Sequence, residues 1–419
     1  MNRRHFLRTA AAAIAFPAIV RGVAPNSKVA VAVIGVNGRG SELALGFAGL
    51  ANVEVAALCD VDERILAKAG GVVSRKTGGT PRGERDFRRL LEDKSIDAIV
   101  LATPDHWHAP AAILACAAGK HAYVEKPCSH NAQEGEWLVA AARQHGRVVQ
   151  HGTQRRSWPA IQEAMAKLRE GAIGRVLSAH AFYFNNRPAI GQGKAAPVPD
   201  GLDWTLWQGP APEREFRDNV VPYHWHWFWH WGTGELGNNG VHMIDVCRWG
   251  LGADHAQRIT SAGRKLRYDD DQETPDANVV HFDTGSATIQ WECRSWAART
   301  PHDPAHDVAF FGENGSLLIT GSGYTIHDPK GREIARGTGP GGNDAHLQNF
   351  IDAIRGEKKL NADIEEGRKS TLLCHLGNIA WRTGQTIDFT PQGGIAGDER
   401  AKKLWRREYR PGWEPRVSG

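Results

Sequence analysis

The chain is 419 residues long, with 41% hydrophobic and 23% charged residues and a formal net charge of +4. A chain of this length and composition is expected to fold into two globular domains. A net charge this small gives no reason to expect nucleic acid as a partner.

The N-terminus predicts an export signal. Arg3 and Arg4 form a twin-arginine pair in a basic segment, and the apolar stretch that follows, residues 9–20, is too short to span a bilayer. This pattern resembles a Tat signal, which exports proteins that are already folded. We therefore expect residues 1–26 to be a signal segment and the protein to be periplasmic, with no membrane-spanning helix elsewhere. A chance basic start on a cytoplasmic protein is the alternative. The six cysteines show neither C-x-x-C nor zinc-ligand spacing, so buried free thiols are expected.

From residue 28 to residue 150, short apolar runs alternate with helical patterns. Strands are predicted at 29–34, 53–58, 98–102, 122–124 and 148–150, and helices at 39–50, 63–69, 109–118 and 132–144. Strict alternation of strand and helix predicts βαβ units in a doubly wound parallel sheet. We therefore expect an α/β Rossmann domain over residues 28–150.

After residue 151 the pattern changes to consecutive strands. A helix (158–169) and a strand (176–184) precede a Pro/Gly-rich loop (187–201) and a Trp/His-rich stretch (204–231). Further strands are predicted at 258–267, 277–282, 286–293, 307–311 and 316–320, and helices at 346–354 and 364–381. Strands with little helix between them favour a mostly antiparallel sheet. Residues 151–419 are therefore expected to form a C-terminal α+β domain for substrate binding and oligomerisation.

The first predicted strand runs into a glycine-rich turn, Gly35-Val-Asn37-Gly38-Arg39-Gly40, and then a helix. A dinucleotide needs a tight turn, close approach of the backbone to its pyrophosphate, and the free N–H groups of a helix N-terminus. Asn37 stands where a second glycine is usual; Asn tolerates left-handed backbone, and Gly38 adds freedom.

Asp60 ends the next predicted strand, about 20 residues after Gly40. A carboxylate at that place binds the ribose 2′-hydroxyl and repels a 2′-phosphate. The sequence therefore predicts a dinucleotide cofactor, NAD in preference to NADP, and leaves NADP open.

Two more segments follow predicted strands, where a doubly wound sheet places its ligands. They are Thr103-Pro104-Asp-His-Trp-His108 and Glu125-Lys126-Pro. At these residues the chain closely resembles the Gfo/Idh/MocA oxidoreductase family, and the resemblance covers nearly all of it after residue 28. Further matching pieces are the glycine-rich turn, residues 234–245, His346 with Asn349 and Phe350, and residues 363–367.

The resemblance implies two catalytic residues. The lysine that matches Lys126 approaches the nicotinamide ribose and the reacting hydroxyl; a lysine beside a cationic ring should have a lowered pKa and can relay a proton. His242 matches the family's general base, and the usual pKa of histidine suits that role. Asn238 replaces the family's aspartate, so it can hydrogen bond a sugar hydroxyl but cannot accept a proton. Asp245, three residues after His242, is expected to orient it.

The glycine-rich turn, Asp60, the aromatic stretch and the resemblance together predict two sets of binding residues. Cofactor contacts are expected from Gly35, Asn37, Gly38, Arg39, Gly40, Asp60, Thr103, Pro104, His108, Glu125, Lys126 and Gln154. Substrate contacts are expected from Arg156, Tyr223, Trp225, Asn238 and Asp245. Residues 223–231 raise the alternative of a metal site, with His224 and His226 on one strand face and His230 or Glu235 completing it. No zinc spacing fits, so we predict no metal and favour a carbohydrate-facing loop.

These features together predict an exported NAD-dependent oxidoreductase acting on a hydroxyl of a sugar, polyol or glycoside. Export would separate the enzyme from free NAD, so a tightly bound cofactor is expected, in a homo-oligomer (dimer or tetramer). The alternative is an NAD-dependent glycosidase that oxidises the sugar transiently, eliminates the aglycone and returns the hydride, with no net redox change. A third interpretation is a non-catalytic protein that senses sugar or cofactor.

Overall fold

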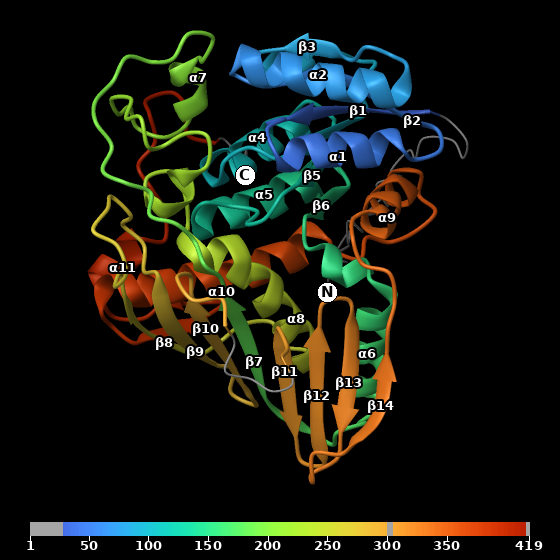
Figure 1. The fold of residues 1–419 in the computed structure, drawn as a ribbon, viewed down its shortest axis with the longest axis vertical. Helices are drawn as coiled ribbons and strands as arrows, with labels where there is room; N and C mark the ends of the chain where they lie inside the picture. Colours follow the sequence, from blue (N-terminus) through green and yellow to red (C-terminus); the bar gives the residue numbers. More distant parts are fainter. Residues whose placement is uncertain (1–27, 300–304, 416–419) are drawn as a thin grey trace, which may run out of the picture.

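The structure is a computed structural model that describes residues 28–299 and 305–415. The predicted signal segment lies outside the described residues. Two domains are stacked end to end, with the first at the top of Figure 1 and a broad sheet below it. None of the helices in the described ranges combines the length and the apolar character needed to cross a bilayer.

The first domain is a parallel sheet with helices on both faces. Its elements are β1 (Val29–Ile34), α1 (Arg39–Ala48), β2 (Val53–Cys59), α2 (Glu63–Thr77), β3 (Arg82–Glu84), α3 (Arg88–Leu91), β4 (Ala98–Leu101), α4 (Asp105–Ala117), β5 (His121–Val124), α5 (Ala132–Gln144) and β6 (Val149–His151). In the described chain six strands pair in the order β3-β2-β1-β4-β5-β6, all parallel. This is the strand order of a Rossmann fold, as predicted.

The apolar sequence of β1 explains its central place in this sheet. Ala32 and Ile34 point into the core on one face of the sheet, and Val31 and Val33 point into the core on the other. A strand covered on both faces needs apolar residues at every position, and β1 has them without interruption.

The second domain is a ten-stranded sheet of the described residues, covered on one face by helices. Its elements are α6 (Pro159–Arg169), β7 (Val176–Phe184), α7 (Trp204–Gln208), α8 (Val241–Leu251), β8 (Arg258–Arg264), β9 (Ala277–Asp283), β10 (Thr288–Arg294), β11 (Val308–Gly312), β12 (Gly315–Thr320), β13 (Gly323–His327), β14 (Glu333–Gly337), α9 (Asp344–Ile354), α10 (Ile364–Thr383), β15 (Ile387–Thr390), β16 (Gly394–Ile395) and α11 (Glu399–Lys403). The order is β14-β13-β12-β11-β7-β10-β9-β8-β15-β16, and β7 with β10 is its parallel pair. The mostly antiparallel sheet confirms the predicted α+β domain.

One helix of the C-terminal half packs on the first domain. Leu347, Phe350 and Ile351 of α9 join the core that contains Phe47 and Tyr123, and Phe350 meets each of those two rings edge-on. Figure 1 shows α9 beside α1 and β6, away from the large sheet. The chain therefore returns to the Rossmann domain after the sheet is built.

A segment between β7 and α8, residues 187–231, climbs along the Rossmann domain to the level of α2 and β3 (Figure 1). We call it the cover segment. Its tryptophans form a small core of their own: Trp204 and Trp207 stack with ring centroids 4.7 Å apart, and Trp231 is 2% exposed. Backbone hydrogen bonds join its residues 201 and 203 to residues 63 and 61 of the Rossmann domain, at 3.0 and 2.9 Å. The aromatic stretch therefore mainly builds and anchors this cover.

All six cysteines lie in the described ranges, and each is a buried free thiol, as predicted: Cys59, Cys116, Cys128, Cys247, Cys293 and Cys374.

Candidate active site

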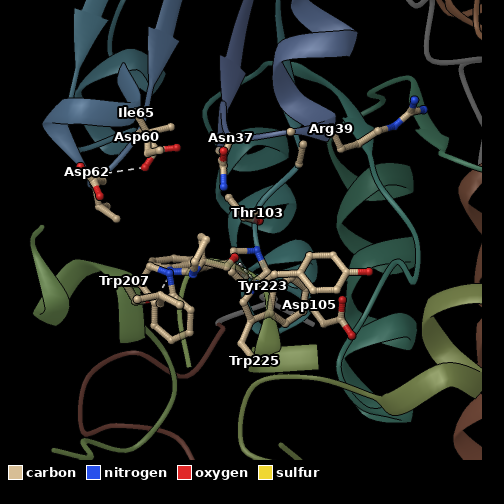
Figure 2. Close-up of a pocket in the computed structure, with 18 of the residues that line it drawn as sticks. Asn37, Arg39, Asp60, Asp62, Ile65, Thr103, Asp105, Trp207, Tyr223 and Trp225 are labelled. Carbon is tan, nitrogen blue, oxygen red and sulfur yellow. Dashed lines mark hydrogen bonds between the residues drawn. The ribbon is translucent and has the colours of Figure 1, made fainter. Parts of the chain in front are cut away.

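A cavity of about 1010 Å³ lies between the cover segment and the carboxyl ends of the Rossmann strands. In Figure 2 Asp60 and Asn37 lie on one side of it, and Trp207 and Tyr223 lie opposite them. The edge formed by the carboxyl ends of the strands is where a doubly wound sheet binds its ligands. The cavity is as large as the largest ordinary ligand sites, so it can hold an extended molecule.

The glycine-rich turn has little room for side chains. A Cβ on Gly35 would lie 2.7 Å from the carbonyl oxygen of Ala102, and one on Gly40 would lie 1.8 Å from that of Gly35. Gly35 and Gly38 have positive φ values of 77° and 44°, and Asn37 does not. The explanation of Asn37 by left-handed backbone was therefore wrong, because Gly38 takes that conformation and Asn37 lines the cavity.

Asp60 closes the end of β2 beside this turn. Its carboxylate accepts hydrogen bonds from the backbone N–H groups of Val36 (2.9 Å) and Asp62 (3.0 Å). Burial raises the pKa of Asp60 to about 6, although those N–H groups favour the ionised form. Asp60 therefore orders the turn and faces the cavity, as the sequence predicted.

Thr103, Pro104 and His108 lie where β4 passes into α4, and all three line the cavity. His108 is buried, with Nδ1 2.6 Å from the carbonyl oxygen of Pro127 and Nε2 2.8 Å from that of Thr103. It thus ties the two predicted segments together. The hydroxyl of Thr103 is buried without a partner, and so is the amide oxygen of Gln154 in the turn after β6. Gln154 itself lies outside the cavity wall.

Arg39, which is half-buried, forms an ion pair with the buried Glu125 across the sheet edge. Arg39 Nε donates to Glu125 Oε1 at 2.6 Å, and another nitrogen of its guanidinium donates to Asn343 Oδ1 at 3.0 Å. Burial alone would raise the pKa of Glu125, but the charges of Arg39 and Lys126 hold it below its usual value. In Figure 2 the side chain of Arg39 runs away from Asp60. Both side chains line the site, but several of their donor and acceptor atoms are already engaged in the Arg39–Glu125 ion pair.

Lys126 is held from the second domain. Its Nζ donates to both the backbone oxygen and the Oδ1 of Asn238, each at 2.8 Å. Because Oδ1 faces the lysine, the amide nitrogen of Asn238 is left to face other groups. Burial lowers the pKa of Lys126, against the negative charges of Glu125 and Asp105. The structure therefore brings together Lys126 and the residue that replaces the family's aspartate.

His242 is the second residue of α8, which continues from a π-helical turn (Leu236–Gly240). Burial, and next the charge of Lys126, lowers the pKa of His242 well below its usual value. His242 does not line the cavity, but a neutral imidazole near Lys126 is in the form that accepts a proton.

Arg156 and Asp245 are bonded to each other. The guanidinium of Arg156 makes a bidentate contact with Asp245 at 2.8 and 2.9 Å, and Ser370 also donates to that carboxylate at 2.6 Å. Both residues are buried and neither lines the cavity. The carboxylate of Asp245 thus bonds Arg156 and Ser370, which differs from its predicted contact with His242.

Tyr223 and Trp225 line the cavity as predicted, and they lie in a cluster that sequence reasoning missed. Arg187 pairs with the buried carboxylate of Glu235 and donates to the hydroxyls of Tyr223 (3.2 Å) and Tyr183 (3.1 Å). These residues come from separate segments, so no local motif could reveal the cluster. The cluster makes this side of the cavity polar, and the charges of Arg187 and Glu235 cancel each other.

Asp105 is a second missed residue. It lines the cavity at the first position of α4, is 2% exposed, and accepts a 2.6 Å hydrogen bond from the hydroxyl of Thr233. Burial raises the pKa of Asp105 to about 7, against the Thr233 hydrogen bond and the charge of Lys126. The acid follows Thr103-Pro104 directly in the sequence, so its position was visible but its partner was not.

The histidines weighed as metal ligands each bond a backbone carbonyl instead. His224 bonds Asn219 and His226 bonds Tyr223 through Nδ1, and His230 Nε2 bonds the carbonyl of residue 212. The expected strand here is wrong, because residues 224–227 form a 3₁₀ turn. Within residues 28–299 and 305–415, no group of three or more His, Cys, Asp or Glu side chains could hold a metal.

The residues that line the cavity fit a dinucleotide. The turn at Gly35 and Gly40 has no space for a Cβ, which leaves backbone N–H groups at the start of α1 open to a pyrophosphate. Asp60 lines the cavity at the end of β2, and the unpartnered hydroxyl of Thr103 lies between Asp60 and Lys126 along the strand ends.

Two family models match the chain. The model described as "Oxidoreductase family, NAD-binding Rossmann fold" matches residues 29–153, and the one described as "Oxidoreductase family, C-terminal alpha/beta domain" matches residues 180–415. Both are models of the Gfo/Idh/MocA group, and the second alone matches more than half of the chain.

Curated relatives match over shorter stretches. A levoglucosan dehydrogenase of Pseudarthrobacter phenanthrenivorans is 28% identical over 193 residues, which is 45% of this chain and 42% of the relative. A glycosyl hydrolase family 109 protein of Shewanella pealeana is 35% identical over 170 residues, 34% of this chain and 37% of the relative. The chain thus spans less than half the length of these relatives.

Solved structures match over nearly the whole fold. A levoglucosan dehydrogenase in complex with NADH and levoglucosan has a TM-score of 0.68 at 19% identity, covering 86% of this chain and 99% of that one. The WlbA dehydrogenase from Bordetella pertussis, in complex with NADH and UDP-GlcNAcA, has a TM-score of 0.66 at 21% identity, covering 87% and 99%. At these identities the likeness shows the fold.

The pair of Arg39 and Glu125 leads to a stability prediction. Arg39→Met leaves Glu125 buried without its cation, which should cost about 3–5 kcal/mol of unfolding free energy at pH 8. In the wild type the lowered pKa of Glu125 adds stability that is lost as pH falls; in the variant burial raises that pKa, so stability is lost as pH rises. The difference in Tm should therefore be largest at pH 8 and shrink toward pH 5.

Thermal denaturation at both pH values tests this, with Arg175→Met as the control. Arg175 forms an exposed pair with Glu313, so its loss should change stability by less than about 1 kcal/mol. An equal loss for Arg39→Met at pH 5 and pH 8 would contradict the assignment.

Proposed function

The chain belongs to the Gfo/Idh/MocA family of NAD-binding oxidoreductases, and from this premise we propose that it is an NAD-dependent enzyme acting on a hydroxyl of a sugar, polyol or glycoside. The observation that carries the proposal is the placement of Lys126, fixed by Asn238 and near His242, at the edge of a cavity that fits a dinucleotide. The bound nicotinamide supplies a hydride acceptor.

The chain's own residues supply the rest of the chemistry. Two N–H groups of Lys126 bond Asn238, so the third is free to donate to the oxygen of a substrate hydroxyl. His242, kept neutral by burial, accepts the proton of that hydroxyl. The amide N–H groups of Asn238, and the one N–H of Asn239 that does not bond Glu235, offer donors to neighbouring hydroxyls.

The cavity wall favours a carbohydrate. Tyr223 and Trp225 offer aromatic faces that stack on sugar rings, and the pairing of Arg187 with Glu235 leaves this wall without net charge. A matched relative is named levoglucosan dehydrogenase, and a similar structure holds NADH and levoglucosan. These features support a neutral sugar over a charged metabolite.

Redox-neutral glycoside cleavage is the second candidate function. Asn238 supports it, because an amide positions a hydroxyl without adding a charge that would favour one direction of proton transfer. Matched relatives are named glycosyl hydrolase family 109 proteins. We also propose, from the twin arginines alone, that the protein is exported folded to the periplasm, where a retained cofactor would suit a reaction without net redox change.

Exchange of the two catalytic residues tests the assignment. Lys126→Met and His242→Gln should retain NAD and lose about 10²–10⁴-fold in turnover of levoglucosan or of a nitrophenyl glycoside, because proton transfer loses its donor or acceptor. His281→Gln on the exposed side of β9 is the control. NADH accumulation indicates the dehydrogenase, and nitrophenol release without added NAD indicates the glycosidase. Wild-type turnover rates in both variants would refute the assignment.

Asp60 is proposed to select NAD over NADP. Its carboxylate should repel a 2′-phosphate above pH 6 and lose that effect as pH falls through its pKa of about 6. NAD should bind at least about tenfold more tightly than NADP at pH 8, and the ratio should shrink at pH 5. Asp60→Asn, measured by titration calorimetry at both pH values, reports the titration of the 2′-phosphate alone. If the ratio of NAD to NADP affinity is the same in the wild type and in Asp60→Asn at every pH, Asp60 does not select the cofactor.

The cover segment is proposed to retain the cofactor, and the open face of the large sheet to join subunits. Trp231→Ala, in the cover core but outside the cavity, should leave a gap and speed NAD loss at least about tenfold, whereas Trp405→Ala should not.

Val279 and Phe311 are 41% and 39% exposed on the sheet face away from the helices, which favours a dimer or tetramer. Native mass spectrometry measures both the NAD that stays bound and the number of subunits. A wild-type monomer without NAD would contradict both proposals.

A further inference from the structure

Asp105 is a buried acid at the active site whose role is not explained by the proposed reaction. It begins α4 directly after Pro104 and is 2% exposed. Its bonded side-chain partner, the hydroxyl of Thr233, is neutral and lies 2.6 Å away. Thr233 is fixed in turn, because Asn378 of α10 donates to its backbone oxygen at 2.8 Å. A buried carboxylate held only by neutral donors is costly unless a cation is near.

Lys126 is the cation placed to act on Asp105, because both side chains line the same cavity. The Thr233 hydroxyl that bonds Asp105 lies against Gly237, and the next residue, Asn238, bonds Lys126. Three carboxylates act on Lys126 in return: Glu125, Asp105 and Glu235. Glu125 is committed to Arg39 and Glu235 is committed to Arg187 by direct ion pairs. Asp105 makes no ion pair with any residue of the described ranges. It is therefore the carboxylate whose charge is left for Lys126.

The direct partner of Lys126 supplies no charge. Asn238 accepts two hydrogen bonds from the ammonium, but an amide is neutral at any working pH. Four other titratable or charged side chains act on Lys126 or lie beside it: Arg39, His108, His226 and His242. Burial lowers the pKa of each of these three histidines, which disfavours their cationic form, and a histidine carries no negative charge in either form. Arg39 is cationic and already paired with Glu125. None of the four can offset the charge of Lys126.

We propose that Asp105 is the countercharge of Lys126, a positioning residue that keeps the lysine protonated while it holds the substrate oxygen. The inference rests on the proposed function for its meaning in catalysis, but the pairing itself is a property of the free protein. When Asp105 takes up a proton, Lys126 loses its countercharge and its ammonium form becomes less favourable. The two groups therefore titrate as a pair, and the state of Lys126 depends on that of Asp105.

Competitive labelling of lysines with acetic anhydride, read by peptide mass spectrometry across pH, reports the apparent pKa of Lys126 without substrate or cofactor. Asp105→Asn keeps an oxygen that accepts from Thr233 but removes the charge. It should lower the apparent pKa of Lys126 by about one unit or more, as expected for losing a charge near a partly buried lysine. Asp254→Asn, an exposed acid on the second domain, is the matched control and should leave it unchanged.

Thr233→Val provides a second variant that keeps Asp105 and removes its hydrogen bond. Without that donor the ionised carboxylate is less stable, so the apparent pKa of Lys126 should fall by less than in Asp105→Asn. If Lys126 has the same apparent pKa in the wild type and in both variants, the proposal is wrong.

A pH profile separates this role from a structural one. For any sugar that the wild type converts, the basic limb of kcat/KM in Asp105→Asn should move to lower pH by about the same shift as the lysine, because the ammonium form of Lys126 is the active one. A uniform loss at every pH would indicate a structural role and overturn the proposal. A wild type that converts no sugar would refute the proposed function, while the labelling shift would still decide the pairing.

Discussion

The ion pair between Arg39 and Glu125 joins the parts of the site that must stay in register. Arg39 opens α1 directly after the glycine-rich turn, and Glu125 precedes Lys126 at the end of β5. The contact of 2.6 Å between them fixes the distance from the turn to the lysine. Through Asn343 the same guanidinium also reaches the segment before α9. A single arginine thus ties the dinucleotide turn, the lysine segment and the returning helix together.

This pairing also decides which charges remain for chemistry. A buried carboxylate is tolerated where a cation matches it, and Glu125, Glu235 and Asp245 each have an arginine. The pairing cancels most of the charge around the cavity. Lys126 and Asp105 both line the cavity without a direct ion pair among the described residues, and each is bonded to a neutral partner. Because the arginine–carboxylate pairs cancel each other's charges, Lys126 and Asp105 are the charged groups left for chemistry.

Much of the Rossmann half could be predicted because its signals are local. The bounds of β1 and α5 were predicted to the residue, since an unbroken apolar run and a 3.6-residue apolar period each leave little choice. The glycine turn and Asp60 carry their chemistry within one segment. β13 to β16 were missed. β13 and β15 alternate buried and less buried residues but are only five and four residues long, β14 has no buried residue, and β16 has two residues.

The missed parts of the site depend on contacts between distant segments. Arg187 meets a carboxylate 48 residues away, and Asp105 meets a hydroxyl 128 residues away. The aromatic stretch misled for a related reason: its alternation of His and Trp imitates a strand, whereas the tryptophans are buried in a small core against α7. The placement of α9 on the first domain was equally invisible, because its apolar face fits either core.

The replacement of an aspartate by Asn238 gains its meaning from these distant contacts. An aspartate there would pair with Lys126 on the side of the cavity that meets substrate. With an amide in its place, the carboxylate that acts on the lysine and has no arginine partner is Asp105, at the buried start of α4. The wall that faces substrate then consists of amides, tyrosine hydroxyls and an arginine whose charge is already matched. Such a wall recognises a ligand by its hydroxyl groups and its ring faces, which agrees with an uncharged sugar.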